Sequence, residues 1–138
     1  MKRSEELAPL SRDHHRGLFA ALKLRRDAPD AREAFLAFWP EGQRHFAIEE
    51  ELLLPAFARH APADHEAIVR VLVEHVDLRR RAQDLAADAD PPAGALRELG
   101  DRLHAHIRHE EDVLFPLVER ALPREELMAL GAAIDEAP

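Results

Sequence analysis

The sequence predicts an all-α protein, and three observations support this. Alanine, leucine, glutamate and arginine, which favour helices, dominate the chain, whereas valine and isoleucine are few. No short run alternates apolar with polar residues, as a half-buried strand would. Prolines set among small or turn-forming residues divide the chain into long segments. Because the loops are short, neighbouring helices should run antiparallel. We therefore expect an up-down-up-down four-helix bundle with a short C-terminal fifth helix.

The first two helices are delimited by turn-forming residues. The first is expected over residues 10–27, directly after Pro9, which suits a first helical turn. The second should extend from Asp30 to about residue 59, because Asp30 and Glu33 have the spacing of an N-terminal capping pair. Within it, Pro40 should start a new turn or kink the axis.

The remaining helices follow two further proline-containing breaks. The third is expected over residues 64–88, with Asp64 as its N-cap, and the fourth over residues 93–121. Residues 123–134 have the pattern of a short amphipathic helix that could cover one end of the bundle.

Composition limits the class of protein. A chain of 138 residues with 46% hydrophobic and 33% charged residues has the size and mix of a single domain, residues 1–138. Its net charge of -8 argues against a nucleic-acid or anionic-membrane partner. Without cysteine, any metal must be bound by histidines and carboxylates. No apolar stretch has the length of a signal peptide or a membrane span, so a cytoplasmic location is expected.

The chain contains a repeat. "HFAIEEELLLP" (45–55) recurs sixty-one residues later as "HIRHEEDVLFP" (106–116). Upstream of each copy, "RDHHRGL" (12–18) and "VEHVDL" (73–78) both place an acid before a histidine, with leucine soon after. Each half should therefore be a helical hairpin that offers one histidine from its first helix and a His-x-x-x-Glu pair from its second. Two such hairpins related by a pseudo-twofold axis would bring four histidines and two glutamates together.

Helix geometry indicates which of these side chains share a face. Residues four apart lie about 40° from each other, so His45 and Glu49 share a face, as do His106 and Glu110. Apolar residues are expected to continue the two faces, which would point the polar pairs into the core: Leu52, Ala56, Val113 and Leu117. The second glutamate of each pair, Glu50 and Glu111, lies about 140° from its histidine, toward solvent or a neighbouring helix.

Such a core needs cations. Four imidazoles and two carboxylates buried without one would leave charges and donors unsatisfied at a cost of several kcal/mol. Two ions with two imidazoles each, sharing both carboxylates as bridges, satisfy all of these groups. This nitrogen-rich set suits iron, with manganese as second choice, better than zinc or magnesium. With a single-atom oxygen bridge, each iron would keep a position for dioxygen, peroxide or nitric oxide.

In this order and spacing, "RDHH", "HFAIEEELLLP", "EH" and "HIRHEEDVLFP" resemble the hemerythrin-like family, also called the HHE cation-binding domain, over residues 10–118. The resemblance implies a non-haem diiron centre, with an oxo or hydroxo bridge, in an antiparallel four-helix bundle. Carried over position by position, it implies these metal ligands: His45, Glu49, His75, His106 and Glu110.

The first helix offers two adjacent histidines, His14 and His15, which lie about 100° apart. The leucine three residues after His15 matches the one after His75 and favours His15, whereas the uniform offset of sixty-one residues favours His14. We take His15 as the predicted ligand and His14 as the alternative, or as a partner for the other nitrogen of a ligand.

One position departs from oxygen-carrying hemerythrins. These have a further histidine on the third helix, four residues before the position of His75, where this chain has Val71. His109, about 60° from the face of His106, is a lower-ranked candidate ligand. The departure favours a symmetric, more open site and speaks against reversible oxygen transport. Relatives with four histidines and two glutamates, including the domain found in iron-sulfur cluster repair proteins, are the nearer comparison.

Three classes of function follow. The leading hypothesis is a diiron protein that binds or senses dioxygen or nitric oxide, or reports iron or redox state. The alternative is an iron-dependent oxidoreductase-like role in peroxide breakdown or in iron delivery for cluster repair, so enzymatic activity stays open. The third is a structural bundle whose histidines form a pH-sensitive core. The chain lacks tyrosine and any phosphate-binding motif, which argues against tyrosyl-radical and nucleotide chemistry. A monomer and a homodimer are both compatible with the sequence.

Overall fold

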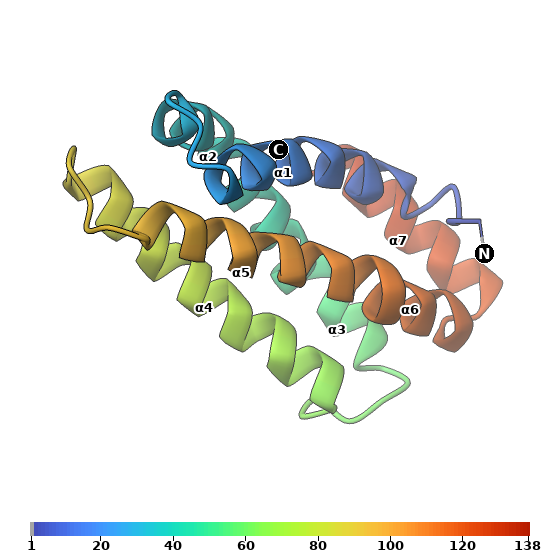
Figure 1. The fold of residues 1–138 in the computed structure, drawn as a ribbon. Helices are drawn as coiled ribbons and strands as arrows, with labels where there is room; N and C mark the ends of the chain where they lie inside the picture. The colour runs from blue at the N-terminus through green and yellow to red at the C-terminus, as the bar shows by residue number, and fades with distance from the viewer. Residues whose placement is uncertain (1) are drawn as a thin grey trace.

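The computed structural model describes residues 2–138, and within that range the regular structure is helical, without strands (Figure 1). The predicted all-α class is confirmed. The helices are α1 (Ala8–Arg25), α2 (Ala31–Ile48), η1 (Glu49–Leu53), α3 (Leu54–Phe57), α4 (Glu66–Ala87), α5 (Ala95–His109), η2 (Glu110–Leu114), α6 (Phe115–Ala121) and α7 (Arg124–Glu136). Each helix in this range is too short or too polar to cross a membrane.

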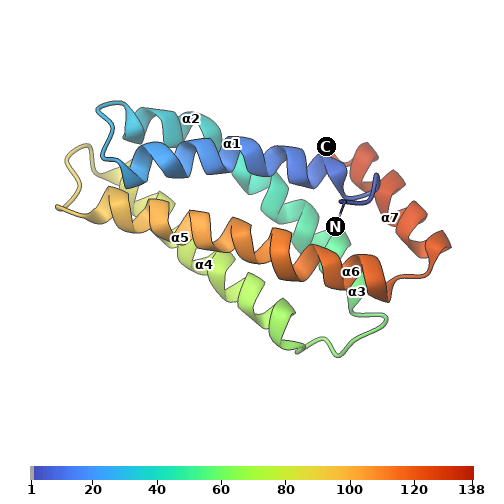
Figure 2. The same ribbon diagram turned by 45° about the vertical axis from the view of Figure 1, so that its right-hand side comes forward.

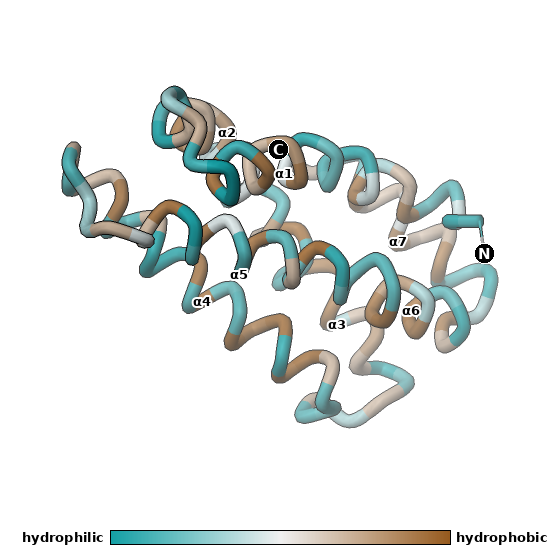
Figure 3. The backbone as a smooth tube through the Cα atoms, viewed as in Figure 1, coloured by the Kyte–Doolittle hydropathy of each residue, from teal (hydrophilic) through white to brown (hydrophobic). Residues whose placement is uncertain are grey.

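The long helices α1, α2, α4 and α5 lie alongside one another (Figures 1 and 2). Helix α1 packs against α2 and α5, and α4 packs against the same two helices. Helix α7 is the expected short C-terminal helix; it contacts η1 and lies beside the start of α1. Hydrophobic and hydrophilic residues alternate around the turns of these helices, as expected when one face is buried (Figure 3).

Each of the two long segments that carry the repeat contains a π-helical turn. In η1 the N–H of Leu54 donates to the carbonyl of Glu49, five residues earlier rather than four. Pro55 comes next; it has no N–H to donate, and in a regular α-helix its ring would collide with the carbonyl of Glu51. The wider turn accommodates the proline. In η2 the same arrangement recurs with Phe115, Glu110 and Pro116.

The π turns decide which residues face the core. Buried positions recur every four residues through both segments: His45, Glu49, Leu53 and Phe57, then His106, Glu110, Leu114 and Val118. In a regular α-helix each step of four residues rotates the side chain by about 40°, and the wider turn removes that accumulated rotation. The expectation that Leu52, Ala56, Val113 and Leu117 continue the faces is therefore wrong. Val113 is 42% exposed, and the other three are only partly buried.

Two apolar clusters fill the interior, and the buried histidines lie between them. On α1, His14 separates Leu10 of the first cluster from Ala21 of the second. On α4, His75 separates Val71 from Leu78 in the same way. The apolar residues of α7 join the first cluster. The polar residues in the middle of the bundle are thus shielded from water on both sides.

The expected capping residues are wrong, although the helix boundaries agree within about two residues. The side chain of Asp30 makes no capping hydrogen bond and pairs with Lys23 instead. Helix α4 is capped by His65 rather than Asp64, because the Nδ1 atom of His65 accepts the N–H of Ala67 at 3.1 Å. Helix α2 continues through Pro40 without a break.

Candidate metal centre

Six polar side chains are buried in the middle of the bundle. Each is at most 4% exposed, and they come from α1, α2, η1, α4, α5 and η2: His14, His45, Glu49, His75, His106 and Glu110. Five of them are the residues that the repeat and the family resemblance point to. The sixth, on α1, is the alternative candidate His14.

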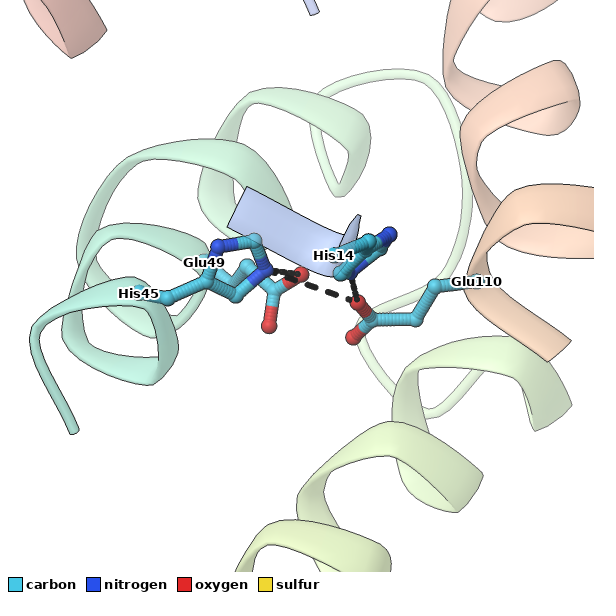
Figure 4. A group of neighbouring side chains, drawn as sticks. All are labelled: His14, His45, Glu49 and Glu110. Atoms are coloured by element: carbon cyan, nitrogen blue, oxygen red, sulfur yellow. Dashed lines mark hydrogen bonds and ion pairs between the residues drawn. The ribbon is translucent and has the colours of Figure 1, made fainter. Parts of the chain in front are cut away.

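These side chains form two groups that share both carboxylates. The first group contains His14 and His45, and the second contains His75 and His106, each with Glu49 and Glu110. Within each group, one donor atom from every residue lies within 4.8 Å of all the others. Figure 4 shows the first group, whose side chains point toward one another from different helices. Each hairpin therefore supplies the two histidines of one group.

Each carboxylate directs one oxygen to each group. Glu49 places Oε2 3.0 Å from Nε2 of His45 and Oε1 3.1 Å from Nε2 of His75. Glu110 places Oε1 2.9 Å from Nε2 of His14 and Oε2 3.1 Å from Nε2 of His106. Two carboxylates in this orientation can bridge two ions, one in each group, with two imidazole nitrogens completing the protein ligands of each ion.

Several of these atoms have no hydrogen-bond partner. In the second group, four buried atoms lack one within residues 2–138: Glu49 Oε1, Glu110 Oε2, His75 Nε2 and His106 Nε2. The short distances among them do not have hydrogen-bond geometry. An unsatisfied buried polar group costs about 1–3 kcal/mol. All four residues belong to a group whose donor atoms lie within 4.8 Å of one another, so a cation there would satisfy them together once the imidazoles are neutral. The residues present therefore fit a metal site.

By contrast, the outer nitrogen, Nδ1, of each of the four histidines has a hydrogen-bond partner. Each Nδ1 donates to a carboxylate: His14 to Glu111 (2.6 Å), His45 to Asp13 (3.1 Å), His75 to Glu50 (2.7 Å) and His106 to Glu74 (2.8 Å). This leaves Nε2 to face the interior, the arrangement that fixes ring orientation in metal-ligating histidines. The four carboxylates obey the sixty-one-residue repeat as well.

Sequence reasoning did not assign a role to these outer carboxylates. The helical spacing directs Glu50 and Glu111 toward either solvent or a neighbouring helix. In the structure both face a neighbouring helix, because each contacts a histidine of another helix. Two signals could have found the set. Asp13 and Glu74 each directly precede a histidine in the repeat, and each His-x-x-x-Glu motif is followed by a second glutamate.

The buried carboxylates change the acidity of the histidines in the metal-free protein. Burial opposes protonation of His106, but the nearby charge of Glu110 and the hydrogen bond to Glu74 raise its pKa to about 10. Burial likewise opposes protonation of His45, yet the charge of Glu49 and a hydrogen bond to Asp13 raise its pKa well above the usual value. Both shifts favour the protonated form of these histidines in the metal-free protein.

Metal binding should accordingly release protons. Because a coordinating imidazole must be neutral, an ion entering the centre displaces the protons held by the raised pKa values. Metal affinity is therefore expected to rise with pH from 6 to 9, and at pH 7 binding should release protons into the buffer. Calorimetry in two buffers of different ionisation enthalpy measures this release. Identical heats in both buffers would contradict it.

The structure places His14, rather than the preferred candidate His15, among the buried polar side chains. The inward face of α1 follows a spacing of three and four residues: Leu10, His14, Gly17, Ala21 and Leu24. His15 lies about 100° away from this face and is exposed. The uniform offset of the repeat was therefore the better guide to which histidine lies inside.

His109 and Val71 complete the list of candidate positions. His109 is only partly buried and lies outside both groups, and burial together with the charge of Arg70 lowers its pKa. Val71 is completely buried in the first apolar cluster. Helix α4, the third of the four long helices, therefore offers a single histidine, His75, to the centre.

A small cavity adjoins the first group. Its volume is about 20 Å³, and three cluster histidines line it: His14, His45 and His106. Most of the remaining wall is apolar: Phe38, Phe46, Leu103 and Ile107, with Gly17 and Gly42. At Gly17 a Cβ atom would come within 2.7 Å of Ile107, so the glycine is needed for this close approach of the helices. A space of this volume can hold about one water-sized molecule.

Comparison with known proteins supports the same interpretation. The model of the hemerythrin HHE cation-binding domain matches residues 8–118, a range that contains all six residues of the two groups. No curated protein and no solved structure matches the chain significantly. Because the match covers most of the 138 residues, the chain belongs to the hemerythrin family of HHE cation-binding domains.

Proposed function

We propose that this chain is a non-haem diiron protein whose centre binds dioxygen or nitric oxide, and in doing so senses that ligand or the redox state of the cell. The observation that carries the proposal is the orientation of Glu49 and Glu110, each with one oxygen in each histidine pair. The proposal includes the antiparallel up-down-up-down order of the long helices.

The donor set supports iron. His14 and His45 would hold one ion and His75 and His106 the other, with Glu49 and Glu110 shared as bridges. Four protein donors per ion leave coordination positions free, and imidazole with carboxylate suits iron, with manganese second. When bound, the iron pair supplies redox chemistry and an open position for a diatomic ligand. The protein would orient the ions through the outer carboxylates.

The position, lining and size of the cavity support a small, apolar molecule as the ligand of the centre. It reaches His14 and His45 of the first group, so a molecule inside it would lie beside the ion that these residues hold. Phe38, Leu103 and Ile107 would exclude bulk water and larger molecules from that position. Its volume of about 20 Å³ suits a diatomic gas and excludes organic substrates, which need pockets of roughly 300 Å³ or more.

Rapid mixing of the reduced iron-loaded protein with dioxygen or nitric oxide tests this function. We expect a saturable spectral change with one ligand molecule per diiron centre, and slow consumption of hydrogen peroxide. If neither gas changes the spectrum while peroxide is turned over catalytically, or iron passes to an apo iron-sulfur protein, the proposal fails. The oxidoreductase-like or iron-delivery role would then take its place.

Substitution of Gly42 tests the role of the cavity. A Cβ at this position would lie 3.1 Å from the rings of Phe38 and Trp39, which must give way by a few tenths of an ångström, and both Gly42 and Phe38 line the cavity. Gly42→Ala is therefore expected to slow nitric oxide association while leaving the iron content unchanged. Met128→Ala serves as the control, because Met128 is 53% exposed on α7 and does not line the cavity. Equal association rates in both variants and the wild type would show that ligands do not use this cavity.

A further inference from the structure

Two of the four histidines of the centre stack on phenylalanine rings, His75 on Phe46 and His14 on Phe115. The ring of His75 lies parallel to Phe46, with ring centroids 3.8 Å apart and planes 9° apart. The guanidinium of Arg79 lies over the same phenyl ring, 5.4 Å from its centroid. The phenyl ring thus contacts both a centre histidine and an arginine on the same helix, α4.

The same arginine also holds the outer carboxylate of that histidine. Arg79 donates from Nη1 to Oε2 of Glu50 at 2.7 Å, and His75 donates from Nδ1 to the same oxygen at 2.7 Å. Four side chains therefore contact one another in a ring: His75, Glu50, Arg79 and Phe46. The carboxylate fixes one edge of the imidazole, and the phenyl ring fixes its plane. Arginine suits this position, because its planar fork can bond a carboxylate and lie over an aromatic ring together.

The other half of the molecule builds a similar set around His14, in which Arg3 also donates to Oε1 of Glu119 at 2.8 Å. The His14 ring stacks on Phe115 with centroids 5.3 Å apart and planes 10° apart, and Arg3 lies over Phe115 at 5.3 Å. Arg3 donates to Oε1 of Glu111 at 3.4 Å and to the main-chain carbonyl of Glu111 at 2.7 Å. Glu111 in turn accepts from Nδ1 of His14 at 2.6 Å.

The sequence repeat does not produce this likeness. Sixty-one residues after Arg3 the chain has Asp64, and sixty-one before Arg79 it has Leu18. The phenylalanines also lack phenylalanine counterparts in the repeat: Ile107 corresponds to Phe46 and Leu54 to Phe115. The two halves reach one arrangement with residues from different elements, which a duplicated sequence alone would not give. A shared requirement of the centre explains it.

We propose that Arg3 and Arg79 are positioning residues of the metal centre, each locking one histidine, His14 or His75, in the orientation that directs Nε2 at the metal. The inference rests on the proposed metal centre. A histidine held by a carboxylate, a phenyl ring and an arginine loses little further freedom when it binds an ion, so the ion leaves slowly. Each arginine thus governs retention of one ion, Arg3 in the first group and Arg79 in the second.

Release of iron from the purified, iron-loaded protein to a chelator tests the inference. In Arg79→Gln, one of the two ions is expected to leave faster than in the wild type, by up to the roughly 10–100-fold that losing a ligand's own hydrogen-bond partner costs in metal affinity. Arg80→Gln is the matched control, because Arg80 is 57% exposed and pairs with the acids Asp77 and Asp84 of its own helix. Equal release in these two variants would overturn the inference. Arg3→Gln should release the other ion, with the exposed Arg16 as its control position.

A double substitution separates positioning from general stabilisation. If Arg79 acts through Glu50, Arg79→Gln combined with Glu50→Ala should release iron little faster than Glu50→Ala alone. Additive effects would overturn the inference. If Arg79→Gln does not fold, Arg79→Lys replaces it in the same test. Iron release from Arg79→Lys as slow as from the wild type would contradict a positioning role for Arg79. A wild-type protein without metal contradicts the proposed function itself, whereas two bound ions with unchanged variants contradict only this inference.

Discussion

Replacing Glu49 or Glu110 with alanine is expected to remove both metal ions, the largest effect that any single substitution should have on the centre. Each of these carboxylates directs one oxygen to each histidine pair, so its loss takes a donor from both ions. The metal content of the purified variants, measured by elemental analysis, should fall from about two ions per chain to nearly none.

Neighbouring acids provide controls for this prediction. Glu51 and Asp112 lie one turn or less from the two glutamates but are exposed, so Glu51→Ala and Asp112→Ala should keep their metal. Glu49→Gln retains the size of the side chain and guards against a loss of metal caused by misfolding. A variant that keeps one ion per chain would mean that the carboxylate serves a single ion rather than bridging two.

His14→Ala is expected to have the second largest effect and to cost one of the two ions. His14 is buried and belongs to the first group only, whereas the second group keeps its two histidines and both carboxylates. Metal content should therefore fall from about two ions per chain to about one. The adjacent His15 is exposed, so His15→Ala is the natural control and should bind metal as the wild type does.

The reverse result would be equally informative. Loss of metal in His15→Ala with full metal in His14→Ala would mean that α1 turns by about 100° when ions bind. Loss of both ions in His14→Ala would show that the two groups fill cooperatively.

The repeat predicted most of the centre because its key relation is local. In a helix, a histidine and a glutamate four residues apart share a face whatever the rest of the fold does, so His45 with Glu49 and His106 with Glu110 could be paired from the sequence. The choice between His14 and His15 could not be made in this way. It depends on which face of α1 packs inward, and packing is a property of the whole bundle.

Two further features could not be predicted from the sequence: the π turns, and the contacts that the histidines of the centre make with outer carboxylates and arginines. A regular helix was assumed through Pro55 and Pro116, so the residues after each glutamate were placed on the wrong face. Arg3 reaches Glu111 across more than one hundred residues of sequence, and no local spacing signals such a contact. The outer carboxylates did leave a trace in the repeat, as acids next to each histidine or glutamate of the motif.

The two groups are proposed to hold a pair of iron ions. Elemental analysis together with an optical spectrum, on protein purified without oxygen and then exposed to air, tests it most directly. We predict about two irons per chain and the appearance of near-ultraviolet bands of an oxygen-bridged iron pair. A protein that contains no metal, or a single zinc ion without colour, would contradict the diiron centre.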